Sequence, residues 1–247
     1  MTRVTALLAS TFLFAATASA QQERFRVDFE NGAAISGYND ARIPGDSGTK
    51  FSLVNDLDSE GVYFWRVRAD VRLAPRHLFS ALVAPLGIDA SGSIDRPVSF
   101  AGGSFPAGVP VVGRYVFNSY RFTYRWEPIQ TDTWRFGFGV TAKERDAAIR
   151  LESAATRAEK TDLGVVPLVN FRLERRLSDK TRLLVEGDAL AAPQGRAEDI
   201  FTGVLVDVAP RLPLKAGYRF LEGGANNDEV YTFAMVHYFA VGTTLRF

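Results

Sequence analysis

The last nineteen residues of the chain, 229–247, constrain the fold more than any other stretch because they alternate in character. Most even positions are small or polar. The odd positions carry a nearly unbroken apolar stripe of Tyr231, Phe233, Met235, Phe239, Val241, Leu245 and Phe247. A period of two indicates a β-strand whose two faces meet different environments. Strands of ordinary sheets run about 5 to 6 residues, so this strand is unusually long for a soluble domain.

The same stretch resembles the closing strand of bacterial outer-membrane β-barrels, in which a terminal Phe and alternating apolar residues form an assembly signal. Phe239, Val241, Leu245 and Phe247 match that pattern, and Thr243 fits it less well. The resemblance implies an all-β, transmembrane, antiparallel up-and-down barrel. It covers only the C-terminus, so the rest of the chain has to agree with it.

The first twenty residues have the pattern of a secretory signal peptide. Arg3 gives a positive start, residues 4–16 are apolar, and Ala18-Ser19-Ala20 forms an A-x-A cleavage site. The apolar part is too short for a membrane-spanning helix, which takes about 20 residues. We therefore expect residues 1–20 to be removed and residues 21–247 to form one exported barrel domain.

Composition narrows the classes of function. The chain carries 29 Lys and Arg against 28 Asp and Glu, and the expected leader contains one of the bases, so the mature chain would be neutral. A neutral chain gives no argument for nucleic acid as a partner. There is no cysteine, which excludes disulfides and thiolate metal sites. No later segment is apolar for the roughly 18 residues that predict a membrane helix.

Alternating segments recur along the whole mature chain. They predict ten strands, at residues 22–37, 61–73, 77–91, 114–127, 134–145, 161–177, 181–192, 199–208, 212–221 and 229–247. An even number fits a bacterial barrel, whose two chain ends both lie on the periplasmic side. Eight strands is the alternative, in case the first segment or 199–221 is not part of the wall.

The connections between these segments alternate in length, as in such barrels. Short turns follow Leu73, Glu127, Leu177 and Val208, and these would be periplasmic. The intervening connections at 38–60, 92–113, 146–160, 193–198 and 222–228 would be extracellular, and three of them are long. A soluble sandwich is the alternative, but it would bury the aromatic face and expose the charged one. Its long strands would also leave hazardous open edges, which closure removes.

The polar face of the expected barrel is heavily charged. Ten strands lie nearer to eight-stranded barrels, which side chains fill, than to sixteen-stranded channels. We expect either a structural network that braces the lumen or a narrow, anion-preferring conduit lined by the surplus of Arg. The predicted network consists of Arg66, Arg68, Asp70, Arg72, Arg121, Arg125, Glu127, Arg135, Arg172, Glu174, Arg182, Glu186, Asp188 and Arg219, with Lys143, Arg176, Asp207 and Lys215 on the same face.

One expected loop resembles the opening of a calcium-binding loop. Residues 56–61 place Asp56, Asp58 and Glu60 at the spacing of hard oxygen ligands. The twelfth position is Val67 instead of a bidentate Glu, and it lies in an expected strand, so the EF-hand pattern fails. We keep two interpretations, a weak surface Ca²⁺ site and a solvated polar loop. No other cofactor is expected.

The connection at 92–113 carries Phe100 and Phe105 among Gly and Pro, apparently exposed. Long loops in compact folds are usually functional or disordered. This one could fold into the barrel mouth as a plug, present its Phe side chains to a partner, or be mobile without any ligand.

Histidine gives little support for catalysis. Outer-membrane lipid A deacylases use a His and a Ser on a barrel strand, and omptin proteases pair Asp with His. Here no Ser lies near His237 on its strand, residue 239 is Phe, and His77 sits just after a short turn. The sequence leaves enzyme activity undecided and favours a non-enzymatic role.

Three hypotheses for function follow. The leading one is a non-enzymatic outer-membrane barrel with a role in surface interaction or envelope integrity. The alternatives are a narrow pore for small anionic solutes and an enzyme that modifies lipid A or phospholipid. The expected partners are outer-membrane lipid, including lipopolysaccharide, and the barrel-assembly machinery. The expected location is the outer membrane of a Gram-negative bacterium, and the sequence names no external ligand.

Overall fold

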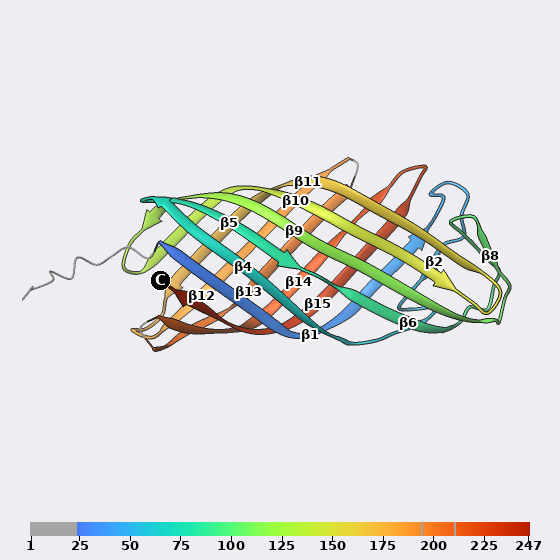
Figure 1. Cartoon of the computed structure of the whole chain (residues 1–247), viewed down its shortest axis with the longest axis horizontal. Helices are drawn as coiled ribbons and strands as arrows, with labels where there is room; N and C mark the ends of the chain where they lie inside the picture. The colour runs from blue at the N-terminus through green and yellow to red at the C-terminus, as the bar shows by residue number, and fades with distance from the viewer. Residues whose placement is uncertain (1–23, 194, 210) are drawn as a thin grey trace, which may run out of the picture.

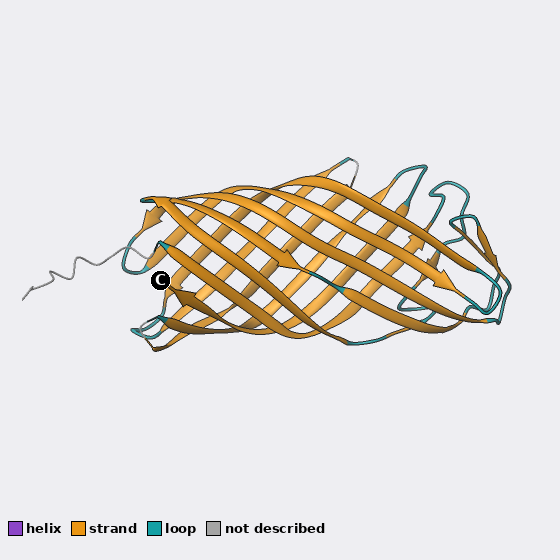
Figure 2. Ribbon diagram, in the orientation of Figure 1, coloured by secondary structure: helices purple, strands orange, loops and turns teal. Residues whose placement is uncertain are grey.

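The computed structural model describes residues 24–247 except 194 and 210, and the chain forms a barrel of antiparallel strands. Strands run along its whole length and loops gather at the two ends (Figures 1 and 2). The wall consists of β1 (Phe25–Arg42), β4 (Val62–Ala74), β5 (His77–Ala84) continued by β6 (Gly87–Ser93), β9 (Pro110–Gln130), β10 (Trp134–Glu152), β11 (Arg157–Arg176), β12 (Thr181–Ala192), β13 (Gly195–Ala209), β14 (Leu212–Asn226) and β15 (Tyr231–Arg246). Each wall strand pairs with the next, and the sheet closes where β15 pairs with β1.

The ten-stranded antiparallel barrel predicted from the alternation is confirmed. The short turns β4–β5, β9–β10, β11–β12 and β13–β14 lie at the end that holds the C-terminus, which we call the inner end (Figure 1). The opposite end is the outer end. The predicted signal peptide, residues 1–20, lies outside the described residues. Among the residues described, no helix is long and apolar enough to cross a membrane.

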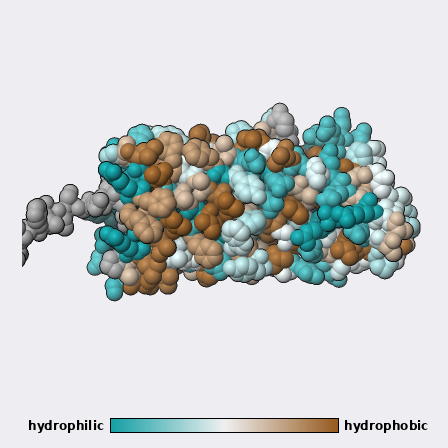
Figure 3. Space-filling model, viewed as in Figure 1, coloured by the Kyte–Doolittle hydropathy of each residue, from teal (hydrophilic) through white to brown (hydrophobic). Residues whose placement is uncertain are grey.

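The outward face of β10 changes character along the strand. Near the inner end it carries Phe136, Phe138 and Val140, and further out it carries Glu144 and Asp146. About 9–11 residues of a tilted strand cross a membrane, and β10 has 19. Apolar residues likewise gather over the half of the surface next to the inner end, and hydrophilic residues over the outer half (Figure 3). The barrel therefore has an apolar belt, and its outer half extends beyond that belt.

The predicted loop at 146–160 is wrong. β10 and β11 continue as a paired ladder to Glu152 and Arg157. β13 begins at Gly195 and β14 ends at Asn226, so both strands extend into the expected loops at 193–198 and 222–228. Beyond an apolar belt both faces of a strand can be polar. The apolar stripe therefore stops although the ladder of backbone hydrogen bonds continues.

The two longest connections fold over the outer end, and we call them the cap. The β1–β4 connection, residues 43–61, and the β6–β9 connection, residues 94–109, both contain short strands. These are β2 (Phe51–Ser52), β3 (Asp58–Ser59) and the hairpin of β7 (Val98–Phe100) with β8 (Gly103–Phe105).

Aromatic packing holds the cap together. The rings of Phe51 and Phe100 meet edge to face with their centroids 5.2 Å apart, and Phe105 is buried in the same apolar cluster. The expectation that Phe100 and Phe105 are exposed is therefore wrong. Alternation reveals which strand residues share a face, whereas the burial of a loop residue depends on contacts with distant segments.

The wall of the outer half is interrupted beside β11. The ladder between β11 and β12 runs only from Val169–Ala189 to Arg176–Arg182. In the described chain, residues 157–168 of β11 therefore pair with β10 alone. The β12–β13 and β14–β15 hairpins end well short of the β10–β11 hairpin (Figure 1). We call this interruption between residues 157–168 and the two shorter hairpins the notch.

Candidate functional site

Charged side chains fill the middle of the lumen, and we call them the plug. The residues of the predicted lumen network lie on the inward face of the barrel, and those nearest the inner end, including Arg135, line the inner mouth. They join one another in ion pairs. The members that form ion pairs are Arg66, Arg68, Asp70, Arg72, Arg121, Arg125, Glu127, Arg172, Glu174, Arg182, Glu186, Asp188 and Arg219.

Asp199 on β13 connects the plug across the lumen. Both Nη atoms of Arg66 on β4 donate to its Oδ2 at 3.0 Å, and Nη1 of Arg219 on β14 donates to its Oδ1 at 2.5 Å. Arg121 on β9 also donates to Asp199, and its other Nη atom reaches Asp188 on β12 at 2.7 Å. Because β4 and β9 do not neighbour β13 in the sheet, these bonds tie opposite walls together.

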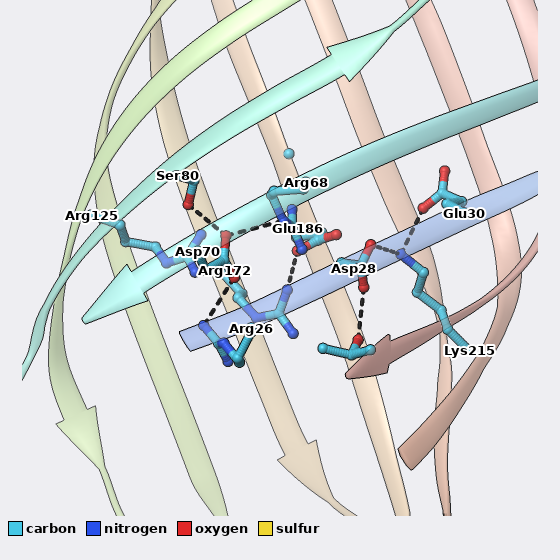
Figure 4. Close-up of polar contacts among 12 residues, drawn as sticks. Arg26, Asp28, Glu30, Arg68, Asp70, Ser80, Arg125, Arg172, Glu186 and Lys215 are labelled. Carbon is cyan, nitrogen blue, oxygen red and sulfur yellow. Dashed lines mark hydrogen bonds and ion pairs between the residues drawn. The ribbon is translucent and has the colours of Figure 1, made fainter. Parts of the chain in front are cut away.

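Two acids of β1 complete the plug. Lys215 Nζ lies 2.6 Å from Asp28 Oδ1 and 2.8 Å from Glu30 Oε2 (Figure 4). Arg219 donates to both oxygens of Glu30 at 2.7 and 3.0 Å. Asp28, Glu30 and Asp199 are not among the residues predicted for the network. The alternation of β1 could have identified Asp28 and Glu30 as inward-facing, because they lie on the face opposite the Phe residues of this strand.

A second group of charges lies beside the first (Figure 4). Arg68 Nη2 lies 3.1 Å from Glu186 Oε2, and its Nε lies 3.4 Å from Asp70 Oδ1. Ser80 donates a hydrogen bond of 2.7 Å to Asp70, and Arg172 forms an ion pair with Glu186. Side chains of four strands, β4, β5, β11 and β12, are thereby linked.

The acids that the prediction missed change the charge balance of the lumen. Asp28, Glu30 and Asp199 each hold Arg or Lys side chains that the prediction counted as surplus. Buried charges persist only when they are paired and hydrogen-bonded. These carboxylates therefore reduce the excess of base that suggested an anion-preferring conduit, but they do not remove it.

The plug divides the hollow space of the barrel into three parts. The inner mouth holds about 500 Å³ and is lined by charged side chains such as Arg72 and Asp207. Between Arg66, Arg121 and Asp188, within the plug, only about 30 Å³ is free, which is the space of about one water molecule. Beyond it, towards the outer end, lies a cavity of about 340 Å³. Among the described residues, the charged side chains of the plug lie between the inner mouth and the outer cavity.

The third space, which we call the outer cavity, has a mixed lining. Tyr115, Phe117, Ile149 and Val236 give it apolar surface, and Lys143 is a buried cation on its wall. The lining also includes residues 160–162 of β11 and residues 221–225 of β14. These segments border the notch, so the cavity lies next to it.

The predicted calcium ligands are not brought together as a site. Both Nη atoms of Arg96 donate to the carboxylate of Asp56, at 2.9 and 2.7 Å, and the Ser52 amide adds a bond of 2.8 Å. Asp58 is exposed on β3, and within the described chain no group of three or more His, Asp or Glu side chains could hold a metal ion. The Asp56 carboxylate serves the cap as a partner of Arg96.

The two histidines each contact a tyrosine. His77 Nδ1 lies 2.8 Å from the hydroxyl of Tyr124, and His237 Nδ1 lies 2.5 Å from that of Tyr218. Tyr218 is partly exposed on the outward face of β14.

The residues of the predicted assembly signal lie on the outward face next to the inner end. Phe239, Val241, Leu245 and Phe247 are all exposed there. The backbone amide of Phe247 donates to the carbonyl of Phe25 at 2.9 Å, and the two rings lie 6.0 Å apart. The last residue of the chain therefore meets the first residue of β1 at the closing seam.

Comparison with known proteins identifies the fold. No family model matches the sequence, and no curated protein matches it. The outer-membrane protease OmpT from Escherichia coli matches 91% of this chain and 97% of its own, with a TM-score of 0.56 at 9% identity. An outer-membrane channel from Pseudomonas putida F1 matches 92% of this chain and 96% of its own, with a TM-score of 0.45 at 7% identity.

The likeness to OmpT is one of fold alone at this identity. Together with the closed ten-stranded wall, it defines the chain as a β-barrel of the bacterial outer-membrane type.

Proposed function

We propose that the protein is a non-conducting, non-enzymatic barrel of the Gram-negative outer membrane, and that its folded outer half serves surface interaction or envelope integrity. The observation that carries the proposal is the plug. Arginines from several strands end on carboxylates of the opposite wall and leave about 30 Å³ between them. A solute cannot pass without breaking several buried ion pairs, and each broken pair leaves an uncompensated charge.

The apolar belt supports the location. Large apolar side chains are exposed around the half of the barrel next to the inner end, including Phe122, Phe138 and Val140. An exposed apolar surface of this extent fits contact with lipid. The partners we propose are therefore outer-membrane lipid and lipopolysaccharide around the belt and, during biogenesis, the barrel-assembly machinery at the C-terminal strand.

Conductance in a planar lipid bilayer tests the proposal. The wild-type protein should insert without steady ohmic current steps. A variant with Arg121→Ala and Asp199→Ala should conduct, because it removes bonds between opposite walls of the plug. Arg157→Ala is the matched control, since that side chain is exposed at the tip of the β10–β11 hairpin. Steady steps from the wild-type protein would contradict the proposal and favour the pore.

Cysteine labelling in intact cells tests the orientation. The chain has no cysteine of its own, so single substitutions report cleanly. Thr156→Cys, at the outer end, should react with a membrane-impermeant maleimide, and Asp179→Cys, in an inner turn, should react only after the cells are broken. The reverse pattern would show that the outer half does not face the exterior.

A further inference from the structure

Lys143 is a buried amine that, among the described residues, forms no ion pair with a carboxylate. Only 2% of its surface is exposed, and its Nζ lies 4.5 Å from the centre of the Phe117 ring. Within the described chain, no carboxylate lies within ion-pair distance of this nitrogen. A buried charge without a partner is costly, so an anion that reached Lys143 would gain an unusually strong interaction.

The carboxylates nearest in the plug are already engaged. Asp188 is held by Arg121 at 2.7 Å, and Asp199 by Arg66 and Arg219 at 3.0 and 2.5 Å. A second buried polar group on the cavity wall is also unsatisfied, because the side-chain amide nitrogen of Asn39 has no hydrogen-bond partner. The outer cavity thus offers a positive charge and a free donor.

Part of the lining suits an apolar body, whereas the charged residues Arg145 and Arg196 in the lining are paired with Asp162 and Glu222. Tyr115, Phe117, Ile149 and Val236 come from three different strands and face the same space. A volume of about 340 Å³ lies at the small end of the range of ligand pockets, roughly 300 to 1,000 Å³. It equals about eleven water-sized groups of about 30 Å³ each.

The position of the notch suggests the route by which a ligand would enter the outer cavity. On its border, the outward-facing Leu163 and Val165 are 71% and 68% exposed. Val165 pairs with Glu144, the position at which the outward face of β10 turns from apolar to charged. The notch therefore begins at the outer edge of the apolar belt, where an amphiphile of the outer leaflet would hold its polar head.

From these features we propose that the outer cavity binds an amphiphilic anion with a single carboxylate or phosphate head, which enters from the outer leaflet through the notch. The anionic head pairs with Lys143, and the apolar body lies against Phe117 and Ile149. This binding site goes beyond the proposed surface role, and it would exist whether or not the plug conducts.

Equilibrium binding to the full-length protein in phosphatidylcholine nanodiscs tests the head group. The probe is 2-naphthoate, and its uncharged counterpart is 2-naphthalenemethanol. Lys143→Met keeps the length of the side chain and removes the charge, so it should weaken naphthoate binding by about tenfold or more and change binding of the alcohol less than about twofold. Lys180→Met, in an inner turn, is the matched control and should change neither.

Ala147→Trp tests the position of the site. Ala147 lines the cavity, and an indole there should fill it and abolish binding of both the acid and the alcohol. Heat-modifiable migration on gels confirms that each variant is folded. The proposal is overturned if naphthoate does not bind the wild-type protein, or if Lys143→Met binds it as tightly as the wild type does.

Displacement of bound naphthoate identifies the source of the ligand. Palmitate supplied within the nanodisc lipid should displace it at a lower free concentration than octanoate supplied in water. Displacement by octanoate alone would overturn entry from the leaflet. Conductance is measured on separate samples, so a failure of this proposal is distinguishable from a failure of the non-conducting barrel.

Discussion

Asp199 shows how much of the interior depends on single side chains. Arginines of β4, β9 and β14 all donate to this one carboxylate. Asp199→Ala leaves three buried guanidinium groups short of a partner, and loss of one member of a buried ion pair typically costs about 3–5 kcal/mol. We expect a fall of that size in the free energy of unfolding, measured by urea titration in lipid vesicles.

Asp179→Ala provides the comparison, because Asp179 lies exposed in an inner turn and contacts only Arg176 across 3.2 Å. Its effect should stay within about 0.5 kcal/mol. Equal losses for the two variants would mean that the plug does not stabilise the barrel. The sequence predicted most members of the plug, because they alternate with apolar residues. It did not predict which arginine meets which carboxylate, since that depends on how strands far apart in sequence face each other across the lumen.

Among the structural elements, the cap depends on pH through the bond between Asp56 and Arg96. The hydrogen bonds from Arg96 lower the pKa of Asp56 below its usual value. A carboxylate whose pKa is depressed by folding stabilises the structure above its unfolded pKa, about 3.9, and loses that contribution as pH falls through the folded value. Below about pH 4 the cap should therefore loosen.

Hydrogen exchange of the loop 52–56, corrected for the intrinsic effect of pH, measures this change. Protection in the wild-type protein should fall at acid pH, and Asp56→Asn should show no such step because residue 56 then no longer titrates. A step of the same size in both proteins would assign the pH dependence to another group.

The aromatic core of the cap gives a second prediction at this scale. Phe100 is fully buried against Phe51, and truncation of a buried Phe costs about 3–5 kcal/mol. Phe100→Ala should therefore expose the loop 94–109 to elastase, which cleaves after small residues such as Val98 and Ala101, while the barrel wall remains resistant. Val112→Ala, at a half-exposed position on β9, should leave the cleavage rate unchanged. The sequence placed this loop correctly but not its fold, because the partners of Phe100 lie in another connection.

For the whole molecule, the number of strands and the alternation of short and long connections were predictable from the sequence. Both follow from a period of two that holds wherever one face meets lipid. The positions at which strands end were not predictable, since beyond the belt the outward residues of β10 become charged while pairing continues to Glu152.

At the scale of the whole molecule, we predict that Phe247 is needed for assembly of the barrel in cells. This residue lies at the rim, and its side chain is 61% exposed although its ring and backbone contact Phe25 at the seam, so the side chain adds little to the packing of the finished barrel. Recognition of an exposed strand by an assembly partner relies on backbone bonds for affinity and on side-chain pockets for specificity. Deleting Phe247, or changing it to Asp, should lower the amount of folded protein in the outer membrane of cells.

Refolding of the same purified variants into detergent should change much less, because no assembly partner takes part. Normal levels of the variants in cells would mean that the terminal Phe has no role in assembly.

The pairing of Glu30 with Arg219 spans 189 positions of the chain, and that of Asp28 with Lys215 spans 187. Neither pair can form until the last hairpin has reached the first strand, and contacts of such long range slow folding. Until then Asp28 lacks Lys215, and among the described residues Glu30 has only the more distant Arg66 of β4, 3.9 Å away, so burying these acids is strongly unfavourable. These interior charges can therefore be fully paired only after the seam between β15 and β1 has closed. The water in the lumen is released only at that stage of biogenesis.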